Sequence, residues 1–151
     1  MITVMYLEDF EPGQKFGSPT LRVDAGDIKA FAAQFDPQPF HLDEGAADRS
    51  FFQGLAASGW HTAALTMRLL VSGEMKIAGG VIGAGVEEFK WPRPVRPGDE
   101  LHVQSEVLEV RPSKSRPAQG LMKVRTTTLN QRDEPVQVFV ATLVVPRRPS
   151  A

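Results

Sequence analysis

The stretch from Ser58 to Gly73, SGWHTAALTMRLLVSG, carries a single formal charge, Arg68. Ser58 is a good helix N-cap, and the Ser-Gly pair at the other end is typical of a helix stop. Apolar side chains recur at helical spacing and form one broad face: Trp60, Ala63, Ala64, Met67, Leu70 and Val71. A helix with so little polar surface predicts a long segment that is mostly buried inside the fold.

After this helix the sequence changes to the two-residue period of β-strands. Alternation is clear from Leu101 to Leu108. We expect four strands, at residues 83–91, 99–110, 120–131 and 135–145. The turn QRDEP joins the last two closely, which indicates an antiparallel hairpin. The economical packing is a sheet wrapped around the long helix, an α+β fold.

The chain length and the edges of the sheet indicate how many domains and how many subunits to expect. The 151 residues fit a single domain that spans residues 1–151. A sheet of this kind leaves an edge strand without a neighbour, and pairing of such edges would satisfy it. We therefore expect a homodimer or a dimer of dimers.

Charge and cysteine content exclude several classes of function. The formal net charge is −1 and there is no cysteine, so we expect no nucleic-acid partner, no disulfide and no cysteine-ligated metal. The three histidines are scattered without the spacing of a metal site. The N-terminus lacks the pattern of a signal peptide and no segment is apolar enough to span a bilayer, which predicts a cytoplasmic protein without membrane association.

A shorter helix is expected in the first third of the chain. Asp24 is placed to cap it, and the Asp36-Pro37 pair ends it because a residue before proline avoids the helical region. Its apolar residues fall on one face: Ile28, Phe31, Ala32 and Phe35. We expect residues 37–57 to be irregular.

The motif DPQPFH places Asp36 and His41 five positions apart, with two prolines between them. A carboxylate and an imidazole that converge on one water can perform general acid–base catalysis, since one accepts a proton while the other holds or returns one. Burial beside phenylalanines would raise the pKa of the aspartate and an imidazolium would lower it. The sequence leaves the direction of that shift open.

The motif ASGWH places Ser58 and Gly59 at the start of the long helix. The free amides and positive dipole at that end can polarise a carbonyl, and Gly59 lets a ligand approach closely. Because position 59 is the first helical residue, the sequence also predicts that proline would be tolerated there. A water-activating pair beside a carbonyl-polarising amide fits addition of water to an α,β-unsaturated carbonyl compound, or the reverse.

The stretch from Phe35 to Leu70 resembles the MaoC-like, (R)-specific enoyl-CoA hydratases of the hot-dog fold, and RPVRPGDELHVQSEVLEV is similar to the strand and turn that follow there. The resemblance implies catalytic roles for Asp36 and His41 and a thioester-polarising amide at Gly59. It also implies a homodimer with active sites at the subunit interface and a coenzyme A thioester as substrate. No other cofactor is expected.

Two positions depart from the family pattern. Gln38 stands where the family has Asn, and Ser58 stands where the family often has His. We expect substrate contacts from four residues: Gln38, Phe40, Ser58 and Trp60.

Two other functions remain open for the same fold. A thioesterase would usually take a carboxylate from the long helix, which has no Asp or Glu. A non-catalytic acyl-CoA binding protein is the second alternative.

Several other side chains have two interpretations each. His61 is an alternative base or a buried structural histidine, and His102 is expected to face solvent. Phe51 and Phe52 either line an acyl pocket or belong to the core. Four basic residues either contact coenzyme A phosphates or are solvated at the surface: Arg93, Arg96, Lys114 and Arg116.

Overall fold

A computed structural model describes residues 3–150; Met1, Ile2 and Ala151, which the expected domain includes, lie outside the described residues. Residues 3–150 form eleven elements in the following order. They are η1 (Leu7–Asp9), β1 (Lys15–Phe16), β2 (Leu21–Arg22), α1 (Ala25–Phe35), α2 (Pro39–Leu42), α3 (Glu44–Asp48), α4 (Gly59–Ser72), β3 (Ile82–Lys90), β4 (Glu100–Pro112), β5 (Gln119–Leu129) and β6 (Pro135–Pro146).

The strands form one antiparallel sheet in the order β1-β4-β5-β6-β3, with β2 paired to the first residues of β4. All four strands predicted for the second half are present, and β5 and β6 form the expected hairpin. Val107, Val124 and Ala141 lie side by side across β4, β5 and β6, and all three are buried. The two-residue alternation therefore does supply the inner face of the sheet.

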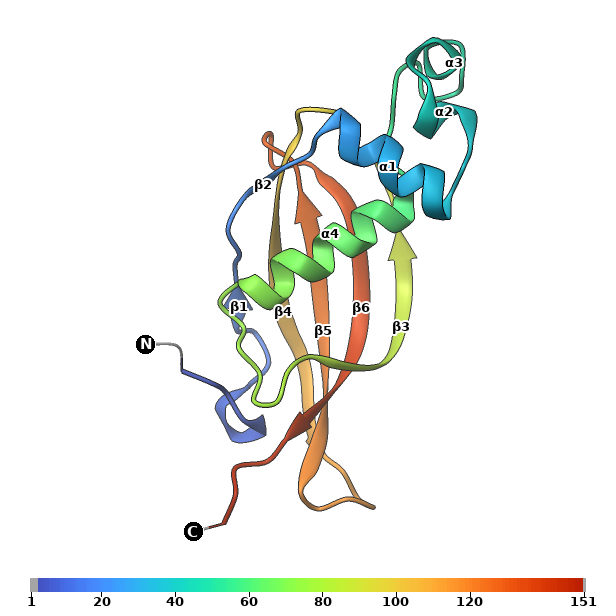
Figure 1. The fold of residues 1–151 in the computed structure, drawn as a ribbon. Helices are drawn as coiled ribbons and strands as arrows, with labels where there is room; N and C mark the ends of the chain where they lie inside the picture. The colour runs from blue at the N-terminus through green and yellow to red at the C-terminus, as the bar shows by residue number, and fades with distance from the viewer. Residues whose placement is uncertain (1–2, 151) are drawn as a thin grey trace.

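The long helix α4 lies across that inner face (Figure 1). Ser58 caps it by accepting a hydrogen bond from the Trp60 amide, and Gly73 follows its last residue. The buried side of α4 consists of His61, Thr62, Thr66, Leu69 and Leu70.

The prediction that α4 is mostly buried was wrong. Trp60 is 61% exposed, and Met67 and Val71 are also exposed. The sheet covers only one side of the helix, and part of the apolar face read from the sequence is the uncovered side. On the buried side, Gln137 donates to the hydroxyl of Thr66 at 3.0 Å, and that hydroxyl pairs with the hydroxyl of Thr128 at 2.6 Å. The polar groups of both buried threonines therefore have hydrogen-bond partners.

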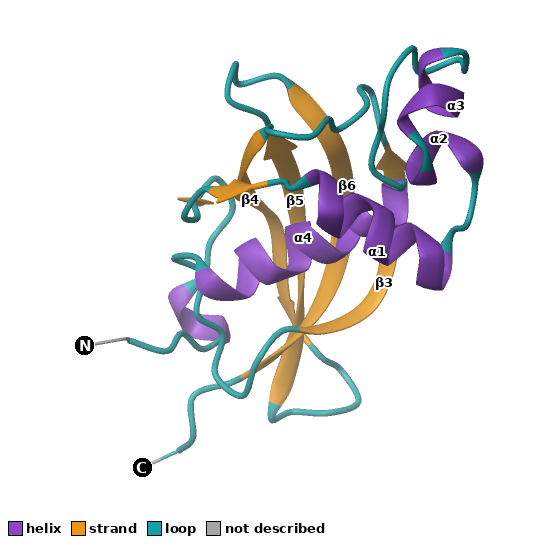
Figure 2. Ribbon diagram, turned by 45° about the horizontal axis from the view of Figure 1, so that its top comes forward, coloured by secondary structure: helices purple, strands orange, loops and turns teal. Residues whose placement is uncertain are grey.

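The helices α1, α2 and α3 gather at one end of α4 (Figure 2). Helix α1 has the expected length, but Asp24 makes no side-chain capping bond and Phe35 is exposed, contrary to prediction. The segment 37–57 is not wholly irregular, since Pro39 begins α2 and Asp43 caps α3 by accepting from the Ala46 amide at 2.8 Å.

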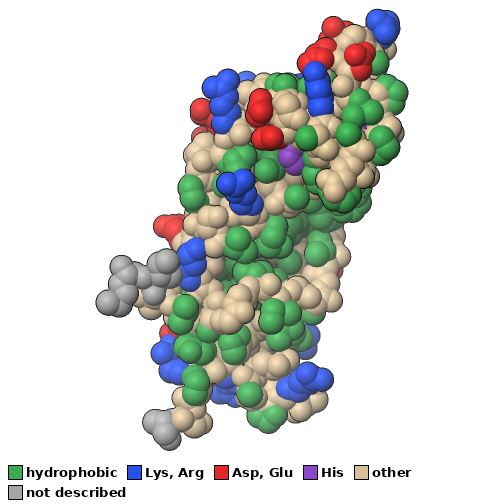
Figure 3. All heavy atoms as spheres, in the orientation of Figure 1, with side chains coloured by type: hydrophobic (Ala, Val, Ile, Leu, Met, Phe, Trp, Pro, Cys, Tyr) green, Lys and Arg blue, Asp and Glu red, His purple; other side chains and the backbone are tan. Residues whose placement is uncertain are grey.

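Strand β3 is an edge of the sheet and exposes all of its residues except Phe89. Hydrophobic side chains gather over the middle of the face seen in Figure 3. None of the helices within residues 3–150 has the length and apolarity needed to cross a bilayer.

Candidate active site

A hollow of about 550 Å³ opens where α1, α2 and the start of α4 meet the segment after β3. Asp36, His41 and Gly59 all line it. Most of its apolar wall is aromatic: Phe40, Phe51, Phe52, Trp60 and Trp91. The structure thus brings the two sequence motifs to one cavity.

Local backbone structure sets the geometry of the acid and the imidazole. Asp36 directly follows α1, and its amide donates to the carbonyl of Ala32, so the carboxylate projects from the end of a helix. His41 lies in α2 and is only 4% exposed. Nε2 of His41 lies 3.4 Å from Oδ2 of Asp36, which is longer than a direct hydrogen bond.

The other nitrogen of His41 fixes its tautomer. Nδ1 lies 2.6 Å from the carbonyl oxygen of Ala56. Because a carbonyl oxygen only accepts, Nδ1 carries a hydrogen and donates it. In the neutral ring Nε2 is then an acceptor that faces the Asp36 carboxylate, which is also an acceptor. The pair can therefore hold a shared proton, or a water that donates a hydrogen bond to each group.

The pKa of Asp36 is lower than its ordinary value. Burial raises it, but hydrogen bonds from the side chains of Ser58 and Gln38 and the charge interaction with His41 together outweigh burial. The Gln38 amide donates to Oδ1 of Asp36 at 2.6 Å. Asp36 is therefore ionised at neutral pH. The sequence alone left the direction of this pKa shift open.

Gly59 is the first residue of α4, at the positive end of the helix dipole. The amide of Trp60 donates to the Ser58 hydroxyl, and the amides of His61 and Thr62 donate to the Ser58 carbonyl. Within the described part of the chain, no hydrogen bond from the Gly59 amide is found, so that donor is available to a ligand.

The indole of Trp91 lies directly against Gly59. A Cβ atom at Gly59 would come within 2.7 Å of Cε2 of that ring. The prediction that proline is tolerated at position 59 is therefore wrong, since the proline ring would overlap the indole. Trp91 was not found from the sequence, because a single tryptophan after β3 has no periodic signal that points to the site.

The predicted substrate-binding residues fall into two groups. Gln38, Phe40 and Trp60 line the hollow, as does Phe51, which is almost fully exposed at its rim. Ser58 is fully buried and does not line the hollow. Its side chain hydrogen-bonds to Asp36 and caps the start of α4.

His61 lies away from the pair. It is buried, its ring stacks on Phe31 at 4.7 Å, and it lines a separate hollow of about 220 Å³ with Asp27. Among residues 3–150, Nδ1 of His61 finds no hydrogen-bond partner, so the ring is not the fully satisfied core histidine of the structural interpretation. Its stacking and its distance from the pair still favour a structural role over that of an alternative base.

Burial lowers the pKa of His61, and the Asp27 carboxylate offsets part of the effect. The unfolded chain then binds the proton more readily than the folded chain. Folding stability should therefore fall as pH drops below the ordinary histidine value of about 6.5. We expect the melting temperature of a His61→Phe variant to depend less on pH between 5.5 and 8 than that of the wild type.

Thr62, the next residue of α4 and also buried, provides a control without a titratable side chain. A Thr62→Val variant should keep the pH dependence of the wild type. Identical pH profiles for His61→Phe and the wild type would contradict the assignment.

The basic residues have different surroundings. Arg93 lines the hollow, donates to the Pro135 carbonyl at 3.1 Å and lies 3.7 Å from Glu134. Arg96 points inward to a loop, contrary to both sequence interpretations. Lys114 and Arg116 are exposed between β4 and β5, outside the lining of the hollow.

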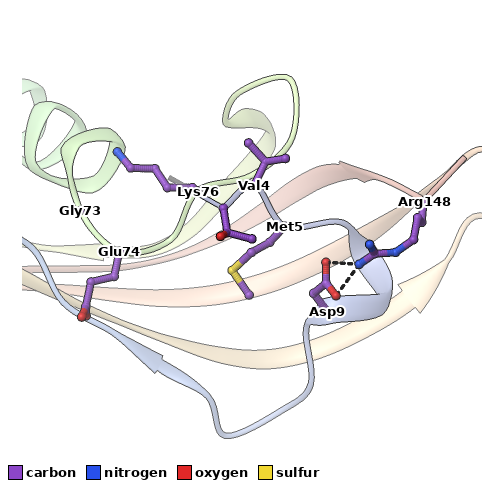
Figure 4. Close-up of a pocket in the computed structure, with 8 residues that line it drawn as sticks. Val4, Met5, Asp9, Gly73, Glu74, Lys76 and Arg148 are labelled. Carbon is purple, nitrogen blue, oxygen red and sulfur yellow. Dashed lines mark hydrogen bonds and ion pairs between the residues drawn. The ribbon is translucent and has the colours of Figure 1, made fainter. Parts of the chain in front are cut away.

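A second hollow of about 730 Å³ lies between the N-terminal segment and the chain after α4 (Figure 4). Its charged groups are already paired within the protein. Arg148 binds the Asp9 carboxylate, Lys76 donates to the Val71 carbonyl at 2.6 Å, and Glu74 accepts from the Gly17 amide. No acid–imidazole pair lines it, so the Asp36–His41 hollow is the better candidate.

Among residues 3–150, no cluster of three His, Asp or Glu side chains has the geometry of a metal site.

Known proteins are similar to this chain in sequence and in structure. The chain is 38% identical over 143 residues to the uncharacterized protein YdeM of Bacillus subtilis, covering 93% of this chain and 97% of that protein. A crystal structure of the MaoC-like dehydratase from Rhodospirillum rubrum superposes with a TM-score of 0.93 and 58% identity, covering 97% of this chain and 99% of the other. The R-hydratase PhaJ1 of Pseudomonas aeruginosa superposes with a TM-score of 0.72 and 29% identity, over 95% of this chain and 86% of the other.

The antiparallel sheet that carries α4 on its inner face is a hot-dog fold, as the sequence resemblance implied. The sequence pattern of the MaoC like domain matches residues 9–130, a span that includes Asp36, His41 and Gly59. The chain therefore belongs to the MaoC-like domain family.

Proposed function

We propose that the protein is a hydratase that adds water to a trans-2-enoyl-CoA thioester to give an (R)-3-hydroxyacyl-CoA, or catalyses the reverse reaction. The observation that carries the proposal is the placement of Nε2 of His41 at 3.4 Å from Oδ2 of Asp36, in a hollow that Gly59 also lines. The likeness to an R-hydratase over most of both chains supports it. Coenzyme A enters as part of the substrate.

Water activation follows from the two facing acceptors. A water between Asp36 and His41 donates one hydrogen to the carboxylate and the other to Nε2. As the water oxygen bonds to C3 of the enoyl group, its proton passes to the pair, with Asp36 as the base and His41 as its partner. A bound acyl group would displace more solvent from Asp36, which raises its pKa and makes it a stronger base.

The electrons displaced from the C2–C3 double bond move toward the thioester oxygen. In this proposal the Gly59 amide, the first of α4, and the positive end of that helix stabilise the developing charge. The proton held by the pair then returns to C2, which completes the addition and restores the original charge state of Asp36 and His41.

A hydration assay tests the proposal. We expect enoyl-CoAs from crotonyl-CoA to longer chains to lose their absorbance in the presence of the protein, with at least one chain length turned over. Release of free thiol without hydration would indicate a thioesterase, although α4 has no acidic residue in its first turn. Thermal stabilisation by an acyl-CoA without turnover would indicate a binding protein.

We also propose that the functional unit is a homodimer, in the cytoplasm, with β3 at the interface. The edge strand β3 exposes Ile82 and Val86, and the exposed Trp60 at the start of α4 packs 5.9 Å from Phe89 of that strand, so apolar surface borders an unpaired strand edge. A second copy of the chain would cover both.

Sedimentation should give twice the chain mass of 16.6 kDa at micromolar concentration. A Val86→Lys variant should sediment as a monomer, because it places a charge in the proposed interface. Val4, 48% exposed against 55% for Val86, provides the control, and Val4→Lys should stay dimeric. A stable wild-type monomer at that concentration would count against the interface.

A further inference from the structure

The guanidinium of Arg96 lies inside a loop that leads to the candidate site. Arg96 follows Val95 in the connection between β3 and β4, a turn in which the sequence predicts a surface residue. Instead Nη1 donates to the carbonyl oxygen of Gly54 at 2.8 Å and lies 3.4 Å from that of Leu55, while Nη2 donates to that of Phe52. The Arg96 side chain thus contacts three backbone carbonyls within residues 52–55.

The loop adopts an unusual backbone to present these carbonyls. Gln53 has a φ of 52°, and Gly54 has a φ of 148°, a conformation that favours glycine. A Cβ at Gly54 would lie 3.1 Å from Nη1 of Arg96, so the absence of a side chain also makes room for the guanidinium. Backbone of this kind persists only where its surroundings hold it in place.

Ala56, directly after Leu55, is the residue that orients His41. The Ala56 carbonyl accepts the Nδ1 hydrogen of His41 at 2.6 Å, and the Ala56 amide donates to the Phe40 carbonyl at 3.2 Å. The Ala57 amide donates to the Val95 carbonyl at 2.9 Å, next to Arg96 itself. The loop held by Arg96 is therefore continuous with the hydrogen bond that sets the tautomer of His41.

Arg96 is itself anchored on the sheet side. Its amide donates to Oδ2 of Asp99 at 2.9 Å, and Asp99 is buried. The other oxygen of Asp99 accepts from the side-chain amide of Gln131 at 3.0 Å. The guanidinium thus joins the turn that precedes β4 to the loop.

We propose that Arg96 is a positioning residue for the hydration reaction: it holds residues 52–55 so that the Ala56 carbonyl keeps the Nδ1–H tautomer of His41, with Nε2 facing Asp36. The proposal rests on the proposed function for its kinetic consequence, but its structural consequence is independent of activity. Arg96 does not contact the reacting atoms; it acts through the backbone of the loop.

The test compares Arg96→Ala and Arg96→Lys with Arg116→Ala. Arg116 is the matched control, since it also precedes a proline but lies exposed in the β4–β5 loop. Nitrogen-15 NMR of the histidine rings reports the tautomer of His41 directly. We expect the Nδ1–H form in the wild type and in Arg116→Ala, and a mixture of tautomers in Arg96→Ala.

Turnover of the enoyl-CoA substrate should fall by about a hundredfold in Arg96→Ala, the effect of a displacement of about 1 Å in a reacting group. The loss should fall on kcat more than on KM. Millimolar guanidinium should restore part of the activity of Arg96→Ala and none of that of His41→Gln. Arg96→Lys, which keeps the charge without the planar fork, should stay impaired.

A merely structural role would lower the melting temperature and leave the ring spectrum of the folded fraction unchanged. If Arg96→Ala does not fold, Arg96→Lys supplies the same spectrum. An unchanged His41 tautomer in a folded variant would overturn the proposal even if the protein is a hydratase. A changed tautomer in a protein without hydratase activity would uphold the positioning role and reject the function.

Discussion

Replacing Asp36 with Asn should lower the rate of enoyl-CoA hydration by about a hundredfold or more, the lower range for loss of a positioned acid or base. Asn keeps the size of the side chain but cannot accept a proton from water. His41→Gln should cost as much, since it removes the acceptor at Nε2, which lies 3.4 Å from Asp36. Because one water or proton needs both groups, the double variant should be little worse than the poorer single variant.

A structural role predicts a different pattern. In that case each variant would melt at a lower temperature and keep its activity per folded molecule. Asp43, two residues beyond His41, provides the matched control because it caps α3 and Asn is an equally good cap. Asp43→Asn should keep wild-type turnover. If Asp36→Asn hydrates crotonyl-CoA and longer enoyl-CoAs as fast as the wild type, the pair is not the catalytic centre.

The strands could be predicted from the sequence because burial on one face of a sheet imposes a strict two-residue period. Leu101, Val103 and Val107 are all buried on β4, as their alternation indicates. The ends of α4 were predictable for a similarly local reason, since a serine cap and a terminal glycine act within one turn.

The candidate pair was predictable because its two residues are near in sequence, and each of the two prolines between them has a specific structural effect. Pro37 helps to end α1 after Phe35, and Pro39 starts α2 at its first position. Each proline therefore marks a helix boundary, and the two helices carry Asp36 and His41 toward each other.

What the sequence could not provide depends on contacts between distant segments. Trp91 and Gly59 are separated by the whole of α4 and β3, and no local pattern indicates that their atoms touch. The inward turn of Arg96 depends on carbonyls more than forty residues earlier in the chain. The exposed side of α4 was missed because apolar periodicity is the same whether a helix faces its own sheet or a second subunit.

The contact between Gly59 and Trp91 leads to the second large effect. Gly59→Ala should destabilise the protein, although alanine is normally the better residue in a helix. The added Cβ would lie 2.7 Å, 2.8 Å and 2.9 Å from three atoms of the indole. That ring cannot shift freely, because its Nε1 donates to the fully buried Gln137 at 2.8 Å and Phe89 packs against it at 4.9 Å.

Overpacking of this kind costs about 1–3 kcal/mol. For a domain of this size, each kcal/mol lowers the melting temperature by roughly 2–4 °C. Gly26 provides the matched control, since it lies in the first turn of α1 and a Cβ there would meet only the flexible Asp24 carboxylate, at 3.2 Å. Gly26→Ala should therefore be neutral or stabilising, with the opposite sign to Gly59→Ala.

A double-mutant cycle with Trp91→Leu isolates the contact from other effects of the substitutions. Leucine removes the ring atoms that the new Cβ would meet, so Gly59→Ala should cost much less in the Trp91→Leu background than in the wild type. Thermal unfolding of the four proteins measures the coupling. A Gly59→Ala variant that melts at or above the wild-type temperature would show that the indole does not lie against Gly59. The glycine would then be required only for approach of the thioester to its amide.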